Sequence, residues 1–215
     1  MALYRLLNNN DHRVECLLTT VNDQFERVSM HGLRTSLLQR QVESIEIEHQ
    51  IVRLEGNVSN EVYESLMSQK LNDLKQKGFT CAGFGDIFLE ELKVYRETQL
   101  RRVGIQCVFP LWKSDTSALI RDFISSGFKT IVICVNAAHL DSSFLGRLVD
   151  EDFLKDLPDG VDPCGENGEF HTFCFDAPFY KNPILFEKGE TVYREYDHNG
   201  VKSGFYFLDL LPADK

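Results

Sequence analysis

The chain has 215 residues, of which 43% are hydrophobic and 26% charged, a composition typical of a globular protein with a sizeable core. Its formal net charge of -10 and pI near 5.1 argue against broad binding to nucleic acid or membrane surfaces, because basic side chains are not in excess. Six cysteines without Cys-x-x-Cys spacing indicate free thiols in a reducing cytosol. No signal peptide opens the sequence and no apolar run has the length of a membrane span, so we expect a cytoplasmic protein.

The first half of the chain alternates between helical and strand patterns. Helices are expected at residues 1–7, 33–45, 60–77 and 88–103, and strands at 14–21, 50–54 and 79–86. Such alternation predicts an α/β fold with a parallel sheet covered by helices, in which ligands bind at the carboxyl ends of the strands. Thr19, Thr20, Gly85 and Asp86 follow or end strands and so lie at such ends.

The second half reads as mixed β structure. Strands are expected at 106–112, 129–136 and 171–175, helices after the cap at 114–116 and over 144–157, and a hairpin from 192–196 and 204–210. The acids at 150–152 are expected on a solvated helix face. We therefore predict two domains, 1–104 and 105–215, with the boundary near Gly104.

An acidic glycine turn stands out within the stretch from Asp162 to Phe179. Glu166, Asn167, Gly168 and Glu169 follow neither a helical nor a strand period, and the strand at 171–175 comes directly after them. Carboxylates in a glycine turn beside a strand suggest a site, although a polar hairpin loop with solvated carboxylates has the same pattern.

Several short motifs, taken in order, resemble the diphthine-ammonia ligase family of ATP pyrophosphatases. They are Ser29-Met-His-Gly32, Gly85-Asp86-Ile87, Phe109-Pro-Leu-Trp112, Val135-Asn136, Gly146-Arg147 and Cys164-Gly-Glu-Asn-Gly-Glu-Phe-His-Thr172. The resemblance implies a Rossmann-like, three-layer α/β/α domain of the adenine nucleotide alpha hydrolase type, followed by a smaller mixed α+β substrate domain.

The same resemblance implies an amide-forming ligase that uses ATP and magnesium. A small-molecule or protein-borne carboxylate attacks the α-phosphorus of ATP, pyrophosphate leaves, and ammonia or another amine displaces AMP from the acyl-adenylate. Adenylation is needed because an ionised carboxylate is a poor electrophile. The resemblance involves neither nucleic acid nor membrane, and it leaves a homodimer open.

Carried over by motif, the resemblance assigns expected roles to individual residues. Nucleotide binding is expected of Thr19, Thr20, Met30, His31, Gly32 and Gly85. Catalysis is expected of Asp86, Glu166, Glu169 and His171, with Asp86 also a magnesium ligand. Substrate binding is expected of Asn167, Gly168 and Trp112.

Other interpretations of these residues stay open. Asp86 could cap the following helix, His31 could be a packed loop residue, and Trp112 could belong to the core. Cys164, His171 and Cys174 could be zinc ligands, although their spacing matches no usual zinc site.

Two departures from the family pattern affect the expected function. The family opens with a strand and a Ser-Gly-Gly-Lys-Asp-Ser loop that cradles pyrophosphate, and this sequence starts just downstream of it. We therefore expect Met1 to be an internal methionine of a longer protein or the gene to have lost its 5′ end. A nucleotide- or substrate-binding protein without turnover is the alternative function.

The second departure lies in the acidic turn. Where family members that amidate diphthine generally read Glu-Gly-Gly-Glu-Tyr-Glu-Thr, this chain has Asn167, Phe170 and His171. The loss of one acid and the gain of an imidazole change the charge beside the expected substrate. We therefore expect an unidentified carboxylate rather than diphthine.

Overall fold

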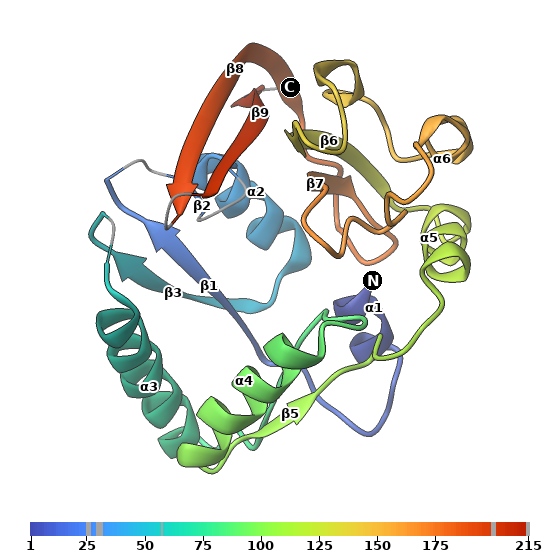
Figure 1. Ribbon diagram of the computed structural model, residues 1–215. Helices are drawn as coiled ribbons and strands as arrows, with labels where there is room; N and C mark the ends of the chain where they lie inside the picture. Colours follow the sequence, from blue (N-terminus) through green and yellow to red (C-terminus); the bar gives the residue numbers. More distant parts are fainter. Residues whose placement is uncertain (25–26, 29–31, 57, 199–200, 214–215) are drawn as a thin grey trace. The chain divides into compact units, whose positions relative to one another are not determined.

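The computed structural model describes residues 1–24, 27–28, 32–56, 58–198 and 201–213, and it shows a mixed α/β protein (Figure 1). The helices are α1 (Ala2–Leu7), α2 (Thr35–Ile45), α3 (Asn60–Gln76), α4 (Glu90–Arg102), α5 (Thr116–Ser125), the short 3-10 helix η1 (Ser142–Phe144) and α6 (Glu151–Asp156). The strands are β1 (Cys16–Asn22), β2 (Arg27–Val28), β3 (Glu48–Leu54), β4 (Cys81–Gly83), β5 (Gln106–Val108), β6 (Lys129–Asn136), β7 (Phe170–Asp176), β8 (Phe186–His198) and β9 (Val201–Pro212).

The chain forms two compact units. The first contains residues 1–25 and 48–114, and the second contains residues 26–47 and 115–215. The sequence predicts a single boundary near Gly104. In the structure the chain passes from the first unit to the second for the last time between Ser114 and Asp115, and residues 26–47 from the first half of the chain belong to the second unit. Across the described residues, no helix is both long enough and apolar enough to span a membrane.

The first unit contains two pairs of parallel strands. β1 pairs with β3 along their full length, and β4 pairs with β5. Helix α1 packs against β4 so closely that a Cβ added at Gly83 would lie 2.5 Å from Leu6 Cδ1. Leu71 of α3, Leu100 of α4 and Ile105 form a small buried cluster. Parallel pairing is therefore confirmed, while the three-layer arrangement stays a prediction.

The second unit is built on an antiparallel four-stranded sheet in the order β7-β6-β9-β8. Strand β6 has the bounds predicted from its apolar run, and its residues 130–135 are all buried. Val132 and Val135 belong to one buried cluster with Phe153 and Phe170. The apolar run of β6 is thus the centre of the core of this unit.

Helix α2 belongs to the second unit because its apolar and polar side chains both contact it. Leu37 is fully buried in a second cluster with Ile131, Ile133 and Phe173. Near the end of α2, Ser44 Oγ donates to the Asn182 carbonyl at 2.5 Å and accepts from the Asn182 amide at 3.1 Å. The helix between β1 and β3 in the sequence therefore covers the antiparallel sheet of the other unit.

One predicted helix is confirmed only in its second half, and two predicted strands are shorter than expected. The pattern at 144–157 gives η1 and α6, separated by an extended stretch that hydrogen-bonds to β6 from Gly146 and Arg147. Gly146 has a φ of +73°, which ends any helix at that point. Of the acids expected on a solvated helix face, Asp150 instead caps α6 by accepting from the Phe153 amide. β4 and β5 each have only three residues, and Pro110 follows soon after β5.

Candidate functional site

The acidic turn of the second unit is a network of hydrogen bonds around two carboxylates. Asp162 Oδ1 accepts from the amides of Cys164 and Glu166 at 2.9 and 3.2 Å. Glu169 accepts from the Asp162 amide at 3.0 Å, from the Asn167 amide at 3.0 Å and from Asn167 Nδ2 at 2.9 Å. The turn is therefore held in one shape by its own side chains.

Glu169 is the buried centre of this turn. It is only 1% exposed, and both of its carboxylate oxygens accept hydrogen bonds. Burial raises the pKa of the Glu169 carboxyl, but hydrogen bonds from Asn167 and Asp162 outweigh burial and lower the pKa below its ordinary value. An ionised, fully engaged carboxylate of this kind holds the turn and does not present itself to solvent.

Glu166 and Asn167 lie further out on the same turn. Glu166 is half-buried and Asn167 is exposed, while Gly168 has a φ of +83° and open space around its Cα. Gly165, with a φ of +70°, is tight: an added Cβ would lie 2.9 Å from the Phe170 carbonyl oxygen. The turn thus has a packed base at Gly165 and Glu169 and an accessible tip at Asn167 and Gly168.

The cysteines near the turn have partners of their own. Cys164 Sγ lies 3.4 Å from the Thr116 carbonyl, and Cys174 Sγ lies 3.4 Å from the Asp176 carbonyl. Burial raises the pKa of Cys164 to about 12 and also raises that of Cys174. In the described residues, no group of three or more His, Cys, Asp or Glu side chains could hold a metal ion.

His171 is connected to Gly32 through the antiparallel sheet. His171 of β7 pairs with Cys134 of β6, and Cys134 pairs with Phe207 of β9. An added Cβ at Gly32 would lie 3.0 Å from the Phe207 ring. Directly paired residues share a face of a sheet, and two strand spacings measure about 10 Å. Gly32 and half-buried His171 therefore lie near one row of the same sheet.

In the first unit, Asp86 forms an ion pair. Its side chain is 6% exposed, and Oδ2 accepts from Arg96 Nε at 2.8 Å. Leu89, not Asp86, is the N-cap residue of α4, so the capping interpretation is wrong. A carboxylate buried against a guanidinium does not fit a magnesium ligand, because magnesium is bound by carboxylates that keep access to water.

Trp112 lies in a half-buried aromatic cluster beyond the carboxyl ends of β4 and β5. Phe109 stacks on Phe84 with ring centroids 5.6 Å apart and contacts Trp112 at 6.0 Å. Lys93 lies 5.2 Å from the Trp112 ring, and Arg96 lies 4.6 Å from the Phe84 ring. Both the core role and the ligand-stacking role of Trp112 are compatible with its partial exposure.

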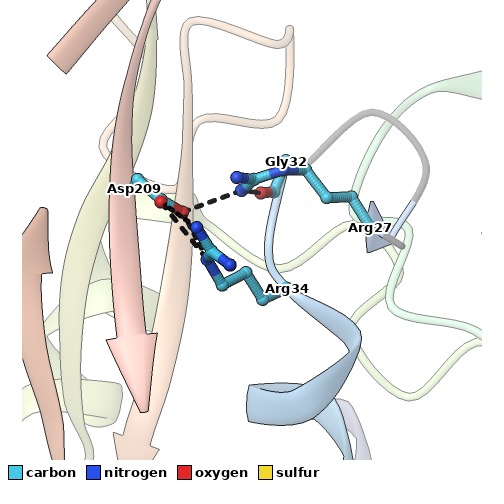
Figure 2. A network of polar contacts seen from close by, with 4 residues as sticks. All are labelled: Arg27, Gly32, Arg34 and Asp209. Atoms are coloured by element: carbon cyan, nitrogen blue, oxygen red, sulfur yellow. Dashed lines mark hydrogen bonds and ion pairs between the residues drawn. The ribbon is translucent and has the colours of Figure 1, made fainter. Parts of the chain in front are cut away.

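Of the other residues predicted to bind the nucleotide, Thr19 and Thr20 lie on β1 and Gly85 follows β4. Thr19 Oγ1 lies 3.0 Å from His49 Nε2, and Thr20 is the next residue along β1. Gly85 is exposed after β4. Met30 and His31 lie outside the described residues. Arg27 and Arg34 both contact Asp209 (Figure 2), and the sequence patterns do not indicate these contacts. The arginines lie 182 and 175 residues before the aspartate, so no local motif contains them together.

The fold and the turn define an α/β protein whose second unit carries a recognised C-terminal domain. A sequence profile described as the diphthamide synthase C-terminal domain matches residues 115–204. The diphthine-ammonia ligase of Danio rerio is 30% identical over 203 residues, covering 91% of this chain and 78% of the relative. The chain belongs to the diphthine-ammonia ligase family.

Two mammalian relatives show the same similarity over less of their length. The diphthine-ammonia ligase of Homo sapiens is 29% identical over 177 residues, and that of Bos taurus is 31% identical over 168 residues. These matches cover 80% and 76% of this chain. The chain spans only 65% and 61% of the length of these two relatives, respectively.

Proposed function

We propose that this chain is the core of a ligase that forms an amide from a carboxylate and ammonia, with ATP cleaved to AMP and pyrophosphate. The carboxylate oxygen bonds to the α-phosphorus and the bond to pyrophosphate breaks. The ammonia nitrogen then bonds to the acyl carbon, AMP leaves with the bridging oxygen, and the nitrogen loses a proton. Membership of the diphthine-ammonia ligase family supports this reaction class.

The sheet row that relates Gly32 to His171 is the observation that carries the proposal. The resemblance assigns Gly32 to the nucleotide, and His171 is expected to be catalytic beside the substrate. A separation of about two strand spacings suits a nucleotide and an acyl group joined in one adenylate. We assign His171 the proton lost by the attacking nitrogen, since an imidazole can act as a base near neutral pH.

In this proposal, the acidic turn supplies two different functions. Glu169 positions the turn through its three hydrogen bonds, whereas Glu166 and Asn167 contact the substrate from the accessible side. Thr19, Thr20, Met30, His31 and Gly85 stay proposed nucleotide contacts. The substrate stays an unidentified carboxylate, because His171 replaces an acid of the diphthine-amidating pattern.

The test is AMP formation from ATP in the presence of ammonia and a panel of carboxylates. The chain should be compared with a version extended at its N-terminus by a strand and a Ser-Gly-Gly-Lys-Asp-Ser loop, which binds pyrophosphate through backbone amides. We expect AMP formation from the extended version that requires both ammonia and one carboxylate. ATP binding without AMP formation in either version would favour the alternative, a binding protein without turnover.

A further inference from the structure

Strand β8 is the outer strand of the antiparallel sheet of the second unit (Figure 1). Among the strands that the structure describes, only β9 pairs with it, so one of its edges is free. Residues 191–197 are all exposed, and they include three large hydrophobic side chains, Val192, Tyr193 and Tyr196, which are 39%, 53% and 48% exposed. A free edge presents backbone N–H and C=O groups to which a further strand can pair.

The sequence of this edge suits pairing with another strand. Residues 191–196 read Thr-Val-Tyr-Arg-Glu-Tyr, a run rich in β-branched and aromatic residues, which favour strands. The run contains neither the proline nor the lysine that commonly protects edge strands. A register shift between Lys188 and Thr191 interrupts β8 before this run, and the pairing with β9 is regular from Thr191 onward. Regular pairing at the outer edge can therefore begin beside the same residue.

Two charged residues of β8 lack a counter-charge within the chain. Glu190 and Arg194 are exposed, and neither has a hydrogen-bond or ion-pair partner among the described residues. When two identical strands pair antiparallel about a two-fold axis, positions equally far before and after the central residue face each other. A pairing centred on Val192 therefore places Glu190 of each copy opposite Arg194 of the other.

Charge favours this centre over the neighbouring ones. Residues 190, 194 and 195 as centres each place a charged side chain opposite its own copy, and residue 191 places Lys188 opposite Arg194. Residue 193 as the centre forms no pair of opposite charges. The centre at Val192 forms two such pairs, and its like-charged pair, Glu187 with Asp197, falls beyond the register shift, where regular pairing ends.

We propose that β8 pairs antiparallel with β8 of a second copy of this chain, with Val192 at the two-fold axis. The two four-stranded sheets then form one continuous sheet across the dimer. Val192 meets its own copy at the centre, and the two pairs of Glu190 and Arg194 flank it. Because pairing along one short strand buries little area, the dimer dissociates on dilution. The inference is independent of the ligase reaction, since no residue of the acidic turn takes part.

Sedimentation velocity of the full chain over a range of concentrations measures the dimer. We expect the mass of the wild type to rise with concentration toward twice the 24.7 kDa of one chain. In E190R and in R194E, the dissociation constant should increase by about tenfold or more, because like charges then face each other at two positions. In the double variant E190R/R194E the opposite charges are restored in exchanged positions, and the dissociation constant should return to within about threefold of the wild type.

Asp152 and Lys155 of α6 provide matched controls. Their side chains are 80% and 70% exposed and form an ion pair at 2.7 Å. D152R changes the charge of the chain as E190R does, and K155E changes it as R194E does. Neither control should alter the dissociation constant. Thermal melting checks that every variant is folded.

A cross-link tests the position of the axis. Val192 lies opposite its own copy, where directly paired Cβ atoms are about 5 Å apart, so a short bismaleimide should join two chains of V192C. Tyr196 lies four residues from the axis, so the two copies of residue 196 are about 27 Å apart. Y196C should therefore give no more cross-linked dimer than the wild type, whose six free cysteines set the background.

Three results would overturn the inference. The first is a wild-type mass that stays at that of one chain at about 100 µM. The second is a dimer that E190R and R194E weaken no more than D152R and K155E do, or that the double variant does not restore. The third is equal cross-linking of V192C and Y196C, which would place the axis elsewhere.

Discussion

At the scale of single residues, Glu169 is the side chain on which the acidic turn depends most. Its buried carboxylate accepts three hydrogen bonds from residues seven and two positions earlier in the chain. The sequence marks Glu166 and Glu169 alike as acids of a glycine turn. Which of them faces inward depends on the close packing of Gly165 against Phe170, which no local pattern encodes.

Replacement of Glu169 by alanine should destabilise the second unit by about 3 kcal/mol, because donors at Asp162 and Asn167 lose their buried acceptor. Urea denaturation followed by circular dichroism measures the change. Glu195 pairs with Lys202 on the surface, and E195A should alter the free energy of unfolding by less than about 0.5 kcal/mol. Equal effects of the two variants would refute the positioning role of Glu169.

The lowered pKa of Glu169 predicts the sign of a pH effect. Because the pKa of this carboxyl in the folded chain lies below the ordinary value of 4.5, the unfolded chain binds more protons between the two values. The stabilisation is therefore complete above the unfolded pKa and is lost as the pH falls through the folded pKa. The difference in unfolding free energy between wild type and E169Q should shrink between about pH 6 and about pH 3. A constant difference would show that the carboxylate charge contributes nothing.

At the scale of elements, the acidic turn needs glycine at its base for a different reason than at its tip. Gly165 and Gly168 both have positive φ, so alanine at either position costs about 1 to 2 kcal/mol of backbone strain. Only at Gly165 does a Cβ also approach the Phe170 carbonyl. G165A should therefore lower the thermal midpoint more than G168A. Equal midpoints would mean that the packing at the base is loose.

Local sequence patterns predict some of the helices and strands correctly and others not. The continuous apolar run of β6 and the capped helix α5 are confirmed, because their signals are local and Asp115 accepts from the Ala118 amide as a cap should. The helix predicted over 144–157 is wrong in its first half, because Gly146 and Arg147 hydrogen-bond to β6 instead of continuing a helix, whereas α6 confirms its second half. Tertiary hydrogen bonds of this kind override a helical spacing of apolar residues.

At the scale of the whole molecule, the unexpected feature is the membership of α2 in the second unit. Local periodicity predicts the helix itself. The contact of Ser44 with Asn182 and that of the N-cap residue Arg34 with Asp209 join residues more than a hundred positions apart, and no single sequence pattern indicates them. A sequence separation of 182 residues likewise hides the contact between Arg27 and Asp209.

Leu37 tests this arrangement. L37A should raise hydrogen exchange in β6 and β7, because Leu37 packs with Ile131, Ile133 and Phe173, and it should cost about 2 to 5 kcal/mol. L71A, a matched truncation in the first unit, should instead raise exchange around α4 and β5. Faster exchange in β1 and β3, with β6 and β7 unchanged in L37A, would contradict the grouping of α2 with the antiparallel sheet.

The most direct test of the ligase assignment follows the oxygen of the substrate. With ATP, ammonia and an ¹⁸O-labelled carboxylate that supports AMP formation by the extended version, an acyl-adenylate transfers one labelled oxygen to AMP for each amide formed. We predict AMP that carries one ¹⁸O, and loss of this product in H171A. ADP as the product, or AMP without the label, would contradict activation of a carboxylate at this site.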